Sequence, residues 1–305
     1  MILHHYETSP FSEKMRLIFG AKNITWQSVS VPSILPKPDV MALTGGYRRT
    51  PFLQIGADIY CDTTLMCQVV DAAVPHPPLY PPAIRGVAEI LAQWADTSLF
   101  WIAVPYTIQP ASMPHMFAGA TPEFMKAFAV DRAAMTPHLK RATLPDAAAQ
   151  LAIYFGRLEN MLSDGRRFLL GAAPCIADFS AVQSLWFMQR SPPVATMLDA
   201  YPNLLAWYDH MRGFGHGTPM EITSTDAISI AANAGGHAPT TIDAAGGFSA
   251  GENVTVTPTD YAYDPVAGQL VGLTNDSVTI ERHDPRAGRV HVHFPRIGFQ
   301  VAKGK

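Results

Sequence analysis

Cysteine is scarce in this sequence, which has three in 305 residues: Cys61, Cys67 and Cys175. An odd number with no C-x-x-C pair argues against a disulfide framework and against a cysteine-based zinc module. The chain also shows no charged segment followed by an apolar run after Met1, so nothing in it indicates a secretion signal. We therefore expect a protein of the reducing cytoplasm.

Long basic runs and long apolar runs are missing as well. The 22 basic and 25 acidic residues give a net charge of -3, and no stretch of Lys and Arg is long enough to follow a phosphate backbone. No uncharged apolar run approaches the roughly 18 to 20 residues of a membrane span. We expect a soluble protein that binds neither nucleic acid nor membrane. Its hydrophobic content of 48% is enough for two cores and a small third module.

The first 78 residues predict a β-α-β-β-α order. A short apolar strand precedes a turn at Ser9-Pro10 and a helix whose apolar residues share one stripe. Pro51 opens a later strand, a position where proline is tolerated and where a cis peptide bond makes a tight turn. The predicted strands are residues 1–5, 24–29, 50–55 and 58–60, and the second helix is 62–73.

Prolines between residues 75 and 82 then end this pattern, and helical periodicity takes over. The predicted helices are 85–102, 121–135, 146–162, 176–188 and 204–211, so residues 85–215 form an all-helical domain. From residue 217 on, a short helix at 226–234, capped by Thr223 or Ser224, leads into a loose Gly/Ala segment. Alternating segments at 254–256, 268–271, 278–281 and 290–294 then predict a small β-barrel or sheet. The fold class is α+β, in three segments: 1–78, 85–215 and 217–305.

Four short segments carry a family resemblance. They are Ser9-Pro10-Phe11-Ser12 followed by Lys14 and Arg16, then Arg49-Thr50-Pro51-Phe52-Leu53, then Asp62-Thr63, and finally residues 171–181, GAAPCIADFSA. Their order and separation over residues 1–215 resemble the glutathione transferase superfamily, and the first segment is closest to the serine-type tau and omega classes. Two features depart from the family pattern: Cys175 stands at a helix N-cap where Ser or Thr is usual, and residues 105–145 are rich in proline.

The resemblance implies a thioredoxin-like N-terminal domain that binds glutathione as cosubstrate, an all-helical second domain, a homodimer and a role in detoxification. It also implies the glutathione contacts. The residue before a cis Pro51 pairs its backbone with the middle of the tripeptide, and Asp62-Thr63 hold the γ-glutamyl group. Arg48 and Arg49 are either solvated turn charges or ligands of the glycine carboxylate, with Arg49 the preferred one. The implied glutathione-binding residues are Arg49, Thr50, Pro51, Asp62 and Thr63.

Three hydroxyls are candidates for holding the glutathione sulfur as a thiolate. Ser9 lies directly before a predicted helix, where its O–H can donate to sulfur while the helix N-terminus adds a favourable field. Lowering a thiol pKa by one to two pH units takes about 1.4 to 2.7 kcal/mol, which one charge-assisted hydrogen bond and a helix terminus can provide. Tyr6, at the end of the first strand, and Ser12 are the rivals. Ser9 could also be a plain N-cap residue.

Aromatic and sulfur-containing side chains predict an apolar surface for a second substrate. We assign Phe11, Trp101, Tyr106 and Met113 to it, which implies an apolar electrophile without identifying it. His291 and His293 lie on one face of a predicted strand with His283 near them. No carboxylate or cysteine joins them at ligand spacing, so we predict no metal site.

Two functions follow from these observations. The first is a glutathione transferase, in which Ser9 stabilises the thiolate that attacks the electrophile. The alternative is a non-catalytic protein whose transferase fold is a binding or dimerisation scaffold for the C-terminal module. The sequence does not reveal what residues 217–305 do.

Overall fold

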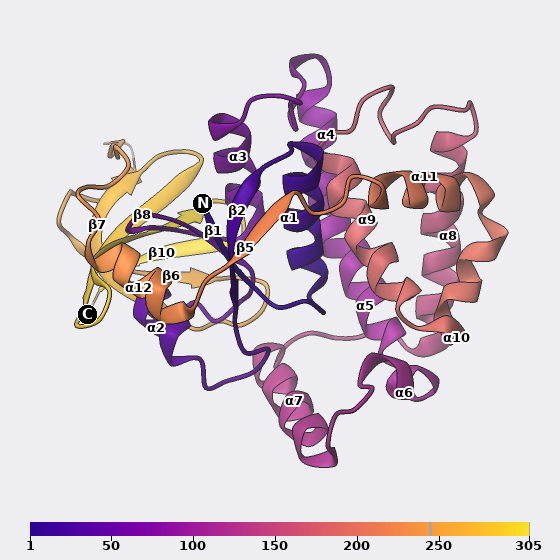
Figure 1. Cartoon of the computed structure of the whole chain (residues 1–305), viewed down its shortest axis with the longest axis horizontal. Coiled ribbons are helices and arrows are strands. Elements are labelled where there is room, and N and C mark those ends of the chain that lie inside the picture. The colour runs from indigo at the N-terminus through magenta and orange to yellow at the C-terminus, as the bar shows by residue number, and fades with distance from the viewer. Residues whose placement is uncertain (244–245, 305) are drawn as a thin grey trace.

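A single ten-stranded sheet connects the two ends of the chain in the computed structural model, which describes residues 1–243 and 246–304 (Figure 1). The strand order across the sheet is β10-β6-β7-β8-β9-β4-β3-β1-β2-β5. The strands are β1 Ile2–His5, β2 Thr25–Ser30, β3 Phe52–Ile55, β4 Asp58–Cys61, β5 Thr218–Glu221, β6 Asn253–Pro258, β7 Val266–Leu273, β8 Ser277–Asp284, β9 Gly288–Pro295 and β10 Phe299–Lys303.

The N-terminal part has the predicted β-α-β-β-α order. Strand β1 pairs in parallel with β2 and antiparallel with β3, and β3 pairs antiparallel with β4. Helix α1 is Pro10–Ala21 and α3 is Thr63–Ala73, while a short α2, Pro38–Thr44, occupies the connection that the sequence showed only as broken by proline. The Thr50–Pro51 peptide bond is cis, as predicted. This is the thioredoxin-like domain.

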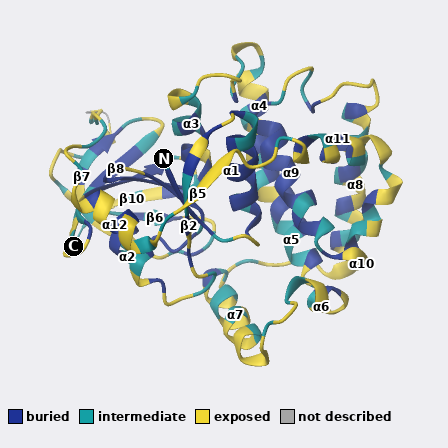
Figure 2. Ribbon diagram, viewed as in Figure 1, coloured by how far each residue is buried: buried dark blue, intermediate teal, exposed yellow. Residues whose placement is uncertain are grey.

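The helical part also follows the predicted order. The helical stretch predicted at 85–102 extends to Thr107 in the structure. It consists of α4 and α5, which are joined by a π-helical turn, Ala95–Leu99, and α5 continues through Pro105. Helix α9 is buried along almost its whole length and lies at the centre of the domain (Figure 2). The helices are α4 Arg85–Trp94, α5 Phe100–Thr107, α6 Met113–Met116, α7 Pro122–Met135, α8 Leu144–Leu162, α9 Ile176–Gln189, α10 Pro192–Ala195 and α11 Pro202–Arg212.

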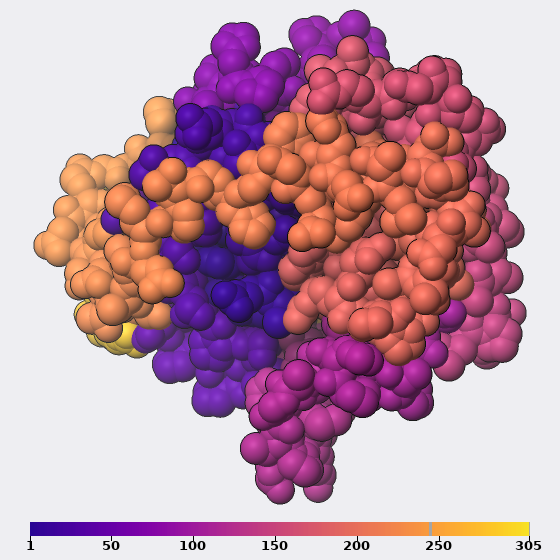
Figure 3. All heavy atoms as spheres, turned by 45° about the vertical axis from the view of Figure 1, so that its right-hand side comes forward, coloured from indigo at the N-terminus to yellow at the C-terminus, as the bar shows by residue number. Residues whose placement is uncertain are grey.

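The C-terminal segment is β-rich, as predicted, but its strands belong to the same sheet as the thioredoxin-like domain. Helix α12, Ser224–Ala232, begins after the predicted cap Thr223, and β9 pairs in parallel with β4. The sequence did not predict β10 or β5, and β5 pairs in parallel with β2. In Figure 3 the segment that follows α11 and contains β5 is orange, and it crosses the indigo surface of the N-terminal domain from the helical domain toward the C-terminal module.

Two hydrophobic clusters form the interior. The first lies between α1 and α3 of the thioredoxin-like domain and the helices of the helical domain. The second lies between the sheet, including its C-terminal strands, and helices α2 and α12. Because each cluster draws residues from more than one of the predicted segments, the division into 1–78, 85–215 and 217–305 remains a proposal about folding units. None of the helices in the described residues is long and apolar enough to cross a membrane.

Candidate active site

Ser9 is the N-cap residue of α1. Its extended backbone ends the loop after β1, and its Oγ accepts a hydrogen bond from the N–H of Ser12 at 3.2 Å, with Pro10 at the first helical position. Ser9 Oγ donates no hydrogen bond to any of the described residues, although Ser9 is only 2% exposed. Ser9 is therefore an N-cap that keeps one unused O–H donor at the positive end of a helix.

The two rival hydroxyls lie in different surroundings. The Tyr6 hydroxyl accepts from Nη2 of Arg132, on α7, at 3.4 Å. The Ser12 hydroxyl is fully buried and has no hydrogen-bond partner within the part of the chain that the structure describes. The three hydroxyls thus share one loop and helix start, but Ser12 lies inside the helix packing and Tyr6 lies toward α7.

The cis peptide bond at Pro51 leaves a backbone edge unoccupied. Across residues 1–243 and 246–304, neither the N–H nor the C=O of Thr50 makes a hydrogen bond. The β1–β3 register pairs His4 with Phe52, so Thr50 lies across from the segment that leaves β1 toward Ser9. Lys37 donates from Nζ to Thr50 Oγ1 at 3.2 Å, and burial, with the charges of Arg132 and Arg48, lowers the pKa of Lys37 to about 8.

Asp62 and Thr63 begin α3 on the same side of the domain. Asp62 caps the helix by accepting from the N–H of Thr64 at 2.9 Å, and it has a φ of 72°, a conformation that is strained for a residue with a Cβ. Thr63 Oγ1 accepts from Nζ of Lys14 at 3.3 Å. Asp62 Oδ1 therefore caps α3, while its Oδ2 lies 3.9 Å from Nη1 of Arg49.

Arg48 and Arg49 are not solvated turn charges. They are 8% and 5% exposed, so that alternative is wrong for both. Arg48 forms an ion pair with Asp131 of α7, and Arg49 donates to the Asp260 carboxylate and to the Tyr261 carbonyl. The partners of Arg49 could not be predicted from local sequence, because Asp260 and Tyr261 lie in the loop between β6 and β7, more than two hundred residues further along the chain.

Comparisons with known proteins agree with this geometry. Residues 3–78 match the family model for the glutathione S-transferase N-terminal domain, and residues 130–210 match the model for its C-terminal domain. The crystal structure of a GST-like protein from Pseudomonas syringae is 42% identical, with a TM-score of 0.83 over 99% of this chain and 98% of that chain. The chain belongs to the glutathione S-transferase superfamily. Comparison with curated proteins gives no match.

Other transferase structures share the fold over a smaller part of this chain. A glutathione S-transferase from Rhodospirillum rubrum F11 is 18% identical, with a TM-score of 0.52 over 69% of this chain and 87% of that chain. A rice transferase in complex with glutathione is 17% identical, with a TM-score of 0.51 over 74% of this chain and 93% of that chain. The Pseudomonas syringae protein, covered almost completely, therefore also has the C-terminal β-rich module.

The β6–β7 loop, residues 259–265, brings the C-terminal module of this transferase-superfamily chain to the cis-proline turn. The Tyr261 ring packs edge-on against Trp101 of α5, with centroids 5.1 Å apart, and the N–H of Ala262 donates to the carbonyl of Met135 at 2.7 Å. One loop thus contacts the Arg49 turn, α5 and the end of α7. It covers the junction of the two transferase domains at the predicted glutathione end.

The predicted apolar residues are only partly brought together. Phe11 packs on Phe100, with ring centroids 4.7 Å apart, and Trp101 packs on Phe100 and Tyr261. Trp101 and Tyr106 line a small cavity of about 80 Å³ between α5 and α8, and Met113, at the start of α6, is not among its lining residues. Whether these side chains bind a substrate stays a prediction.

A buried network of charged and polar side chains packs against α1, and it was not predicted from the sequence. Lys14 Nζ donates to Asp96 in the π-helical turn at 2.7 Å, and Asp96 also accepts from Ser180 at 3.1 Å and from Gln183 at 2.6 Å. Burial is the largest single effect and lowers the pKa of Lys14, but the charge and hydrogen bond of Asp96, together with Cys67 and Asp62, raise the pKa overall. The network fixes α1, and with it Ser9, against the helical domain.

Proposed function

We propose that this protein is a glutathione transferase in which Ser9 holds the glutathione sulfur as a thiolate for attack on an apolar electrophile. The observation that supports this most directly is the unused O–H donor of Ser9 at the N-terminus of α1. A hydrogen bond to a thiolate is stronger than one to a neutral thiol, so this donor would favour the reactive ionised form.

The surroundings of Ser9 offer contacts for the rest of the tripeptide. The free N–H and C=O of Thr50 can form main-chain hydrogen bonds with the central peptide unit of glutathione. An extended peptide adds to the edge of a β-sheet in the same way. Asp62 and Thr63 would hold the γ-glutamyl end, where the ammonium group meets a carboxylate. The glycine carboxylate would compete with Asp260 for Arg49.

Calorimetric titration of glutathione into the full chain, paired with turnover of a chlorodinitrobenzene, tests this function. We expect millimolar or tighter binding, with Ser9→Ala retaining binding and losing about 10²-fold or more in turnover, the order of effect of removing one donor to a developing anion. Ser12→Ala is the matched control, and Tyr6→Phe separates the rival hydroxyl. Wild-type turnover in Ser9→Ala, with loss in Tyr6→Phe, would transfer the role to Tyr6.

One observation favours a second candidate, a non-catalytic transferase fold that carries the C-terminal module. Arg49 already has a carboxylate partner within the chain, and Ser9 is 2% exposed, so the site is covered before any ligand arrives. Absence of glutathione binding at millimolar concentration would support this scaffold. The homodimer, the cytoplasmic location and the role in detoxification remain proposals that derive from the family.

A further inference from the structure

A cluster of imidazole and carboxylate groups lies where the C-terminal module joins the thioredoxin-like sheet. The parallel register of β4 and β9 places Asp58 beside His291 and Tyr60 beside His293. Because side chains two residues apart in a strand share a face, all four lie on one side of the sheet. His237 reaches the same place from the irregular segment between α12 and β6.

Three potential ligand atoms converge in this cluster. Asp58 Oδ1 lies 3.8 Å from Nδ1 of His237 and 3.9 Å from Nδ1 of His291, and each of the three residues offers a ligand atom within 4.8 Å of those of the other two. Both Nδ1 atoms are buried, and neither has a hydrogen-bond partner among the residues that the structure describes. Two orphaned nitrogens beside one carboxylate are costly unless something occupies the space between them.

Neighbouring groups orient each of these atoms. His291 Nε2 lies 3.2 Å from Glu281 Oε2, so Nε2 carries the hydrogen and Nδ1 presents its lone pair. Asp58 Oδ2 accepts from the N–H of Ala238 at 2.8 Å, and Oδ1 is 2.8 Å from Nε2 of His293. In metalloproteins, a ligand histidine commonly donates its second ring N–H to a carboxylate, and a ligand carboxylate accepts hydrogen bonds from nearby donors. Such partners hold the ligands in position.

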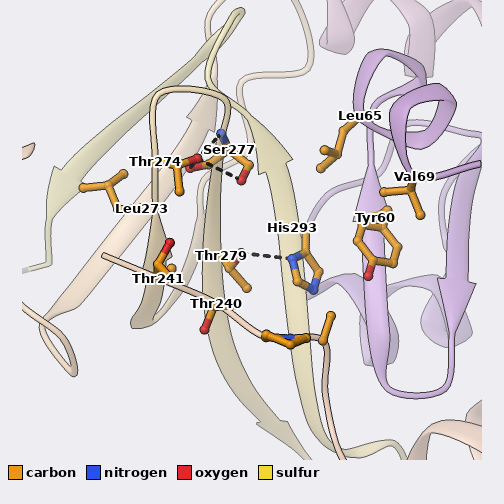
Figure 4. A pocket seen from close by; sticks show the side chains of 13 residues that line it. Tyr60, Leu65, Val69, Thr240, Thr241, Leu273, Thr274, Ser277, Thr279 and His293 are labelled. Carbon is orange, nitrogen blue, oxygen red and sulfur yellow. Dashed lines mark hydrogen bonds between the residues drawn. The ribbon is translucent and has the colours of Figure 1, made fainter. Parts of the chain in front are cut away.

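Figure 4 shows how His293 is held in this arrangement. Its Nδ1 lies 2.9 Å from Thr279 Oγ1, and its ring stacks on Tyr60 with centroids 4.4 Å apart. These two residues and His293 line a cavity of about 260 Å³ between α3 and the C-terminal strands. With Nδ1 accepting from Thr279, Nε2 donates to Asp58, so His293 positions the carboxylate rather than adding a lone pair.

We propose that Asp58, His237 and His291 bind a divalent first-row transition-metal ion, with Zn²⁺ as the reference ion. Two neutral imidazoles and a carboxylate are the protein ligands of many zinc and non-haem iron sites, and such sites keep positions open for water or another ligand. Ligand bonds of about 2.0 to 2.2 Å separate tetrahedral ligand atoms by about 3.3 to 3.6 Å. Binding therefore shortens the two distances from Asp58 Oδ1 to the imidazole nitrogens by a few tenths of an ångström.

Ion binding also changes one feature of the cluster. The rings of His237 and His291 are stacked, with centroids 3.7 Å apart and planes 12° apart, so the two ring planes are nearly parallel. His291 is held in a strand by Glu281, whereas His237 belongs to an irregular segment. The His237 ring turns out of the stack to share the ion, which couples metal binding to the position of this segment.

The site is separate from the proposed glutathione site. Asp58 begins β4 and Asp62 follows its end, and a four-residue strand spans about 13 Å. A metal site could not be predicted from the sequence, because only His283, His291 and His293 lie close together along the chain. The carboxylate and the second ligand nitrogen come from Asp58 and His237, which lie far from His291 along the chain.

Metal binding by the full-length chain tests the proposal. After chelator treatment, titration with Zn²⁺ in the presence of a chromophoric chelator gives stoichiometry and affinity, and Co²⁺ gives the visible spectrum of the bound ion. We expect one ion per chain, a Co²⁺ spectrum typical of nitrogen and oxygen ligands at low coordination number, and a rise in Tm with Zn²⁺. His237→Ala should weaken binding about 10²-fold or more, because a ligand is lost.

His283→Ala is the matched control, since His283 is an exposed histidine on the adjacent strand β8. It should bind Zn²⁺ like the wild type. His291→Gln provides a second ligand variant, and its circular dichroism spectrum reports whether it has folded. Wild-type affinity in His237→Ala, loss of binding in His283→Ala, or no bound ion in the wild type would each overturn the site, the last leaving a bridging water as the occupant.

Discussion

The guanidinium carbon of Arg49 lies 3.7 Å from the centre of the Tyr261 ring, and the same guanidinium donates to the Asp260 carboxylate. Arg49 directly precedes the residue whose backbone edge is free, and Tyr261 belongs to the C-terminal module. The module is therefore tied to the transferase domain at the cis-proline turn as well as along the β4–β9 pairing. The second contact covers the region where the family would bind its tripeptide.

Asp260→Asn should increase the affinity for glutathione if the tripeptide and Asp260 compete for Arg49. The Asp260 side chain is 40% exposed, so its ion pair contributes about 0.5 to 1 kcal/mol, which corresponds to a two- to fivefold lower Kd or KM. Asp264→Asn, an exposed change in the same loop, is the control and should have no effect. Weaker binding in Asp260→Asn would mean instead that Asp260 organises the site.

Asp96→Asn should destabilise the folded chain by about 3 to 5 kcal/mol, because it leaves the buried ammonium of Lys14 without a counter-charge. Urea unfolding followed by circular dichroism measures this change. Glu89→Gln breaks the exposed ion pair with Arg85 and should change stability by less than about 1 kcal/mol. Similar effects of the two substitutions would show that the Lys14 network carries little stability.

Gly20→Ala should be severely destabilising, because a Cβ at this position in α1 would lie 2.1 Å from the carbonyl oxygen of Gly215 and 2.4 Å from that of Phe214. Both are backbone atoms, so relief requires α1 to separate from the chain after α11. Gly86→Ala is the matched change, since a Cβ there meets nothing within 4 Å, and helix propensity predicts a gain of up to about 1 kcal/mol. Thermal unfolding of both variants checks the contrast, and equal Tm values would contradict it.

Stability should fall as the pH drops from about 6.5 to about 4. Burial lowers the pKa of His4 to about 4, although its hydrogen bond to Gln54 opposes the shift. In this pH range the His4 side chain is protonated in the unfolded chain but stays neutral in the folded chain. Protonation of His4 therefore favours unfolding by about 3 kcal/mol. The contribution is fully present above pH 6.5.

His4→Gln should flatten this pH dependence, which urea unfolding at several pH values would measure. His115→Gln, a substitution at an exposed histidine of α6, is the control and should leave the slope unchanged. An unchanged slope in His4→Gln would assign the acid sensitivity to other groups.

The sequence predicted the fold and the place of the candidate site because both depend on local signals. Apolar periodicity marked α7, α8, α9 and α11 to within a few residues, and the turn at Ser9-Pro10 marked the start of α1. The proline directly before β3 predicted the cis bond at Pro51. Each of these features is encoded within a few consecutive residues.

Two edge strands, β5 and β10, were missed because neither carries a strong alternating pattern of its own. β5 is exposed along its whole length, and β10 has a single buried residue, so partner strands rather than apolar burial hold them in place. Backbone pairing leaves no trace in side-chain composition. The solvated-charge interpretation of Arg48 and Arg49 was wrong for a related reason: their partners, Asp131 and Asp260, are far along the chain.

By itself, the sequence determined the element types and the loop that presents Ser9, because propensity, capping and turn chemistry act over a few neighbouring residues. The superfamily followed from the resemblance of four motifs in their order. Only the tertiary structure decided that the C-terminal strands continue the thioredoxin-like sheet, that Asp260 and Tyr261 meet Arg49, and that Asp58, His237 and His291 share one space. These contacts join residues that are far apart along the chain, and they form only when burial of the second hydrophobic cluster aligns β4 with β9.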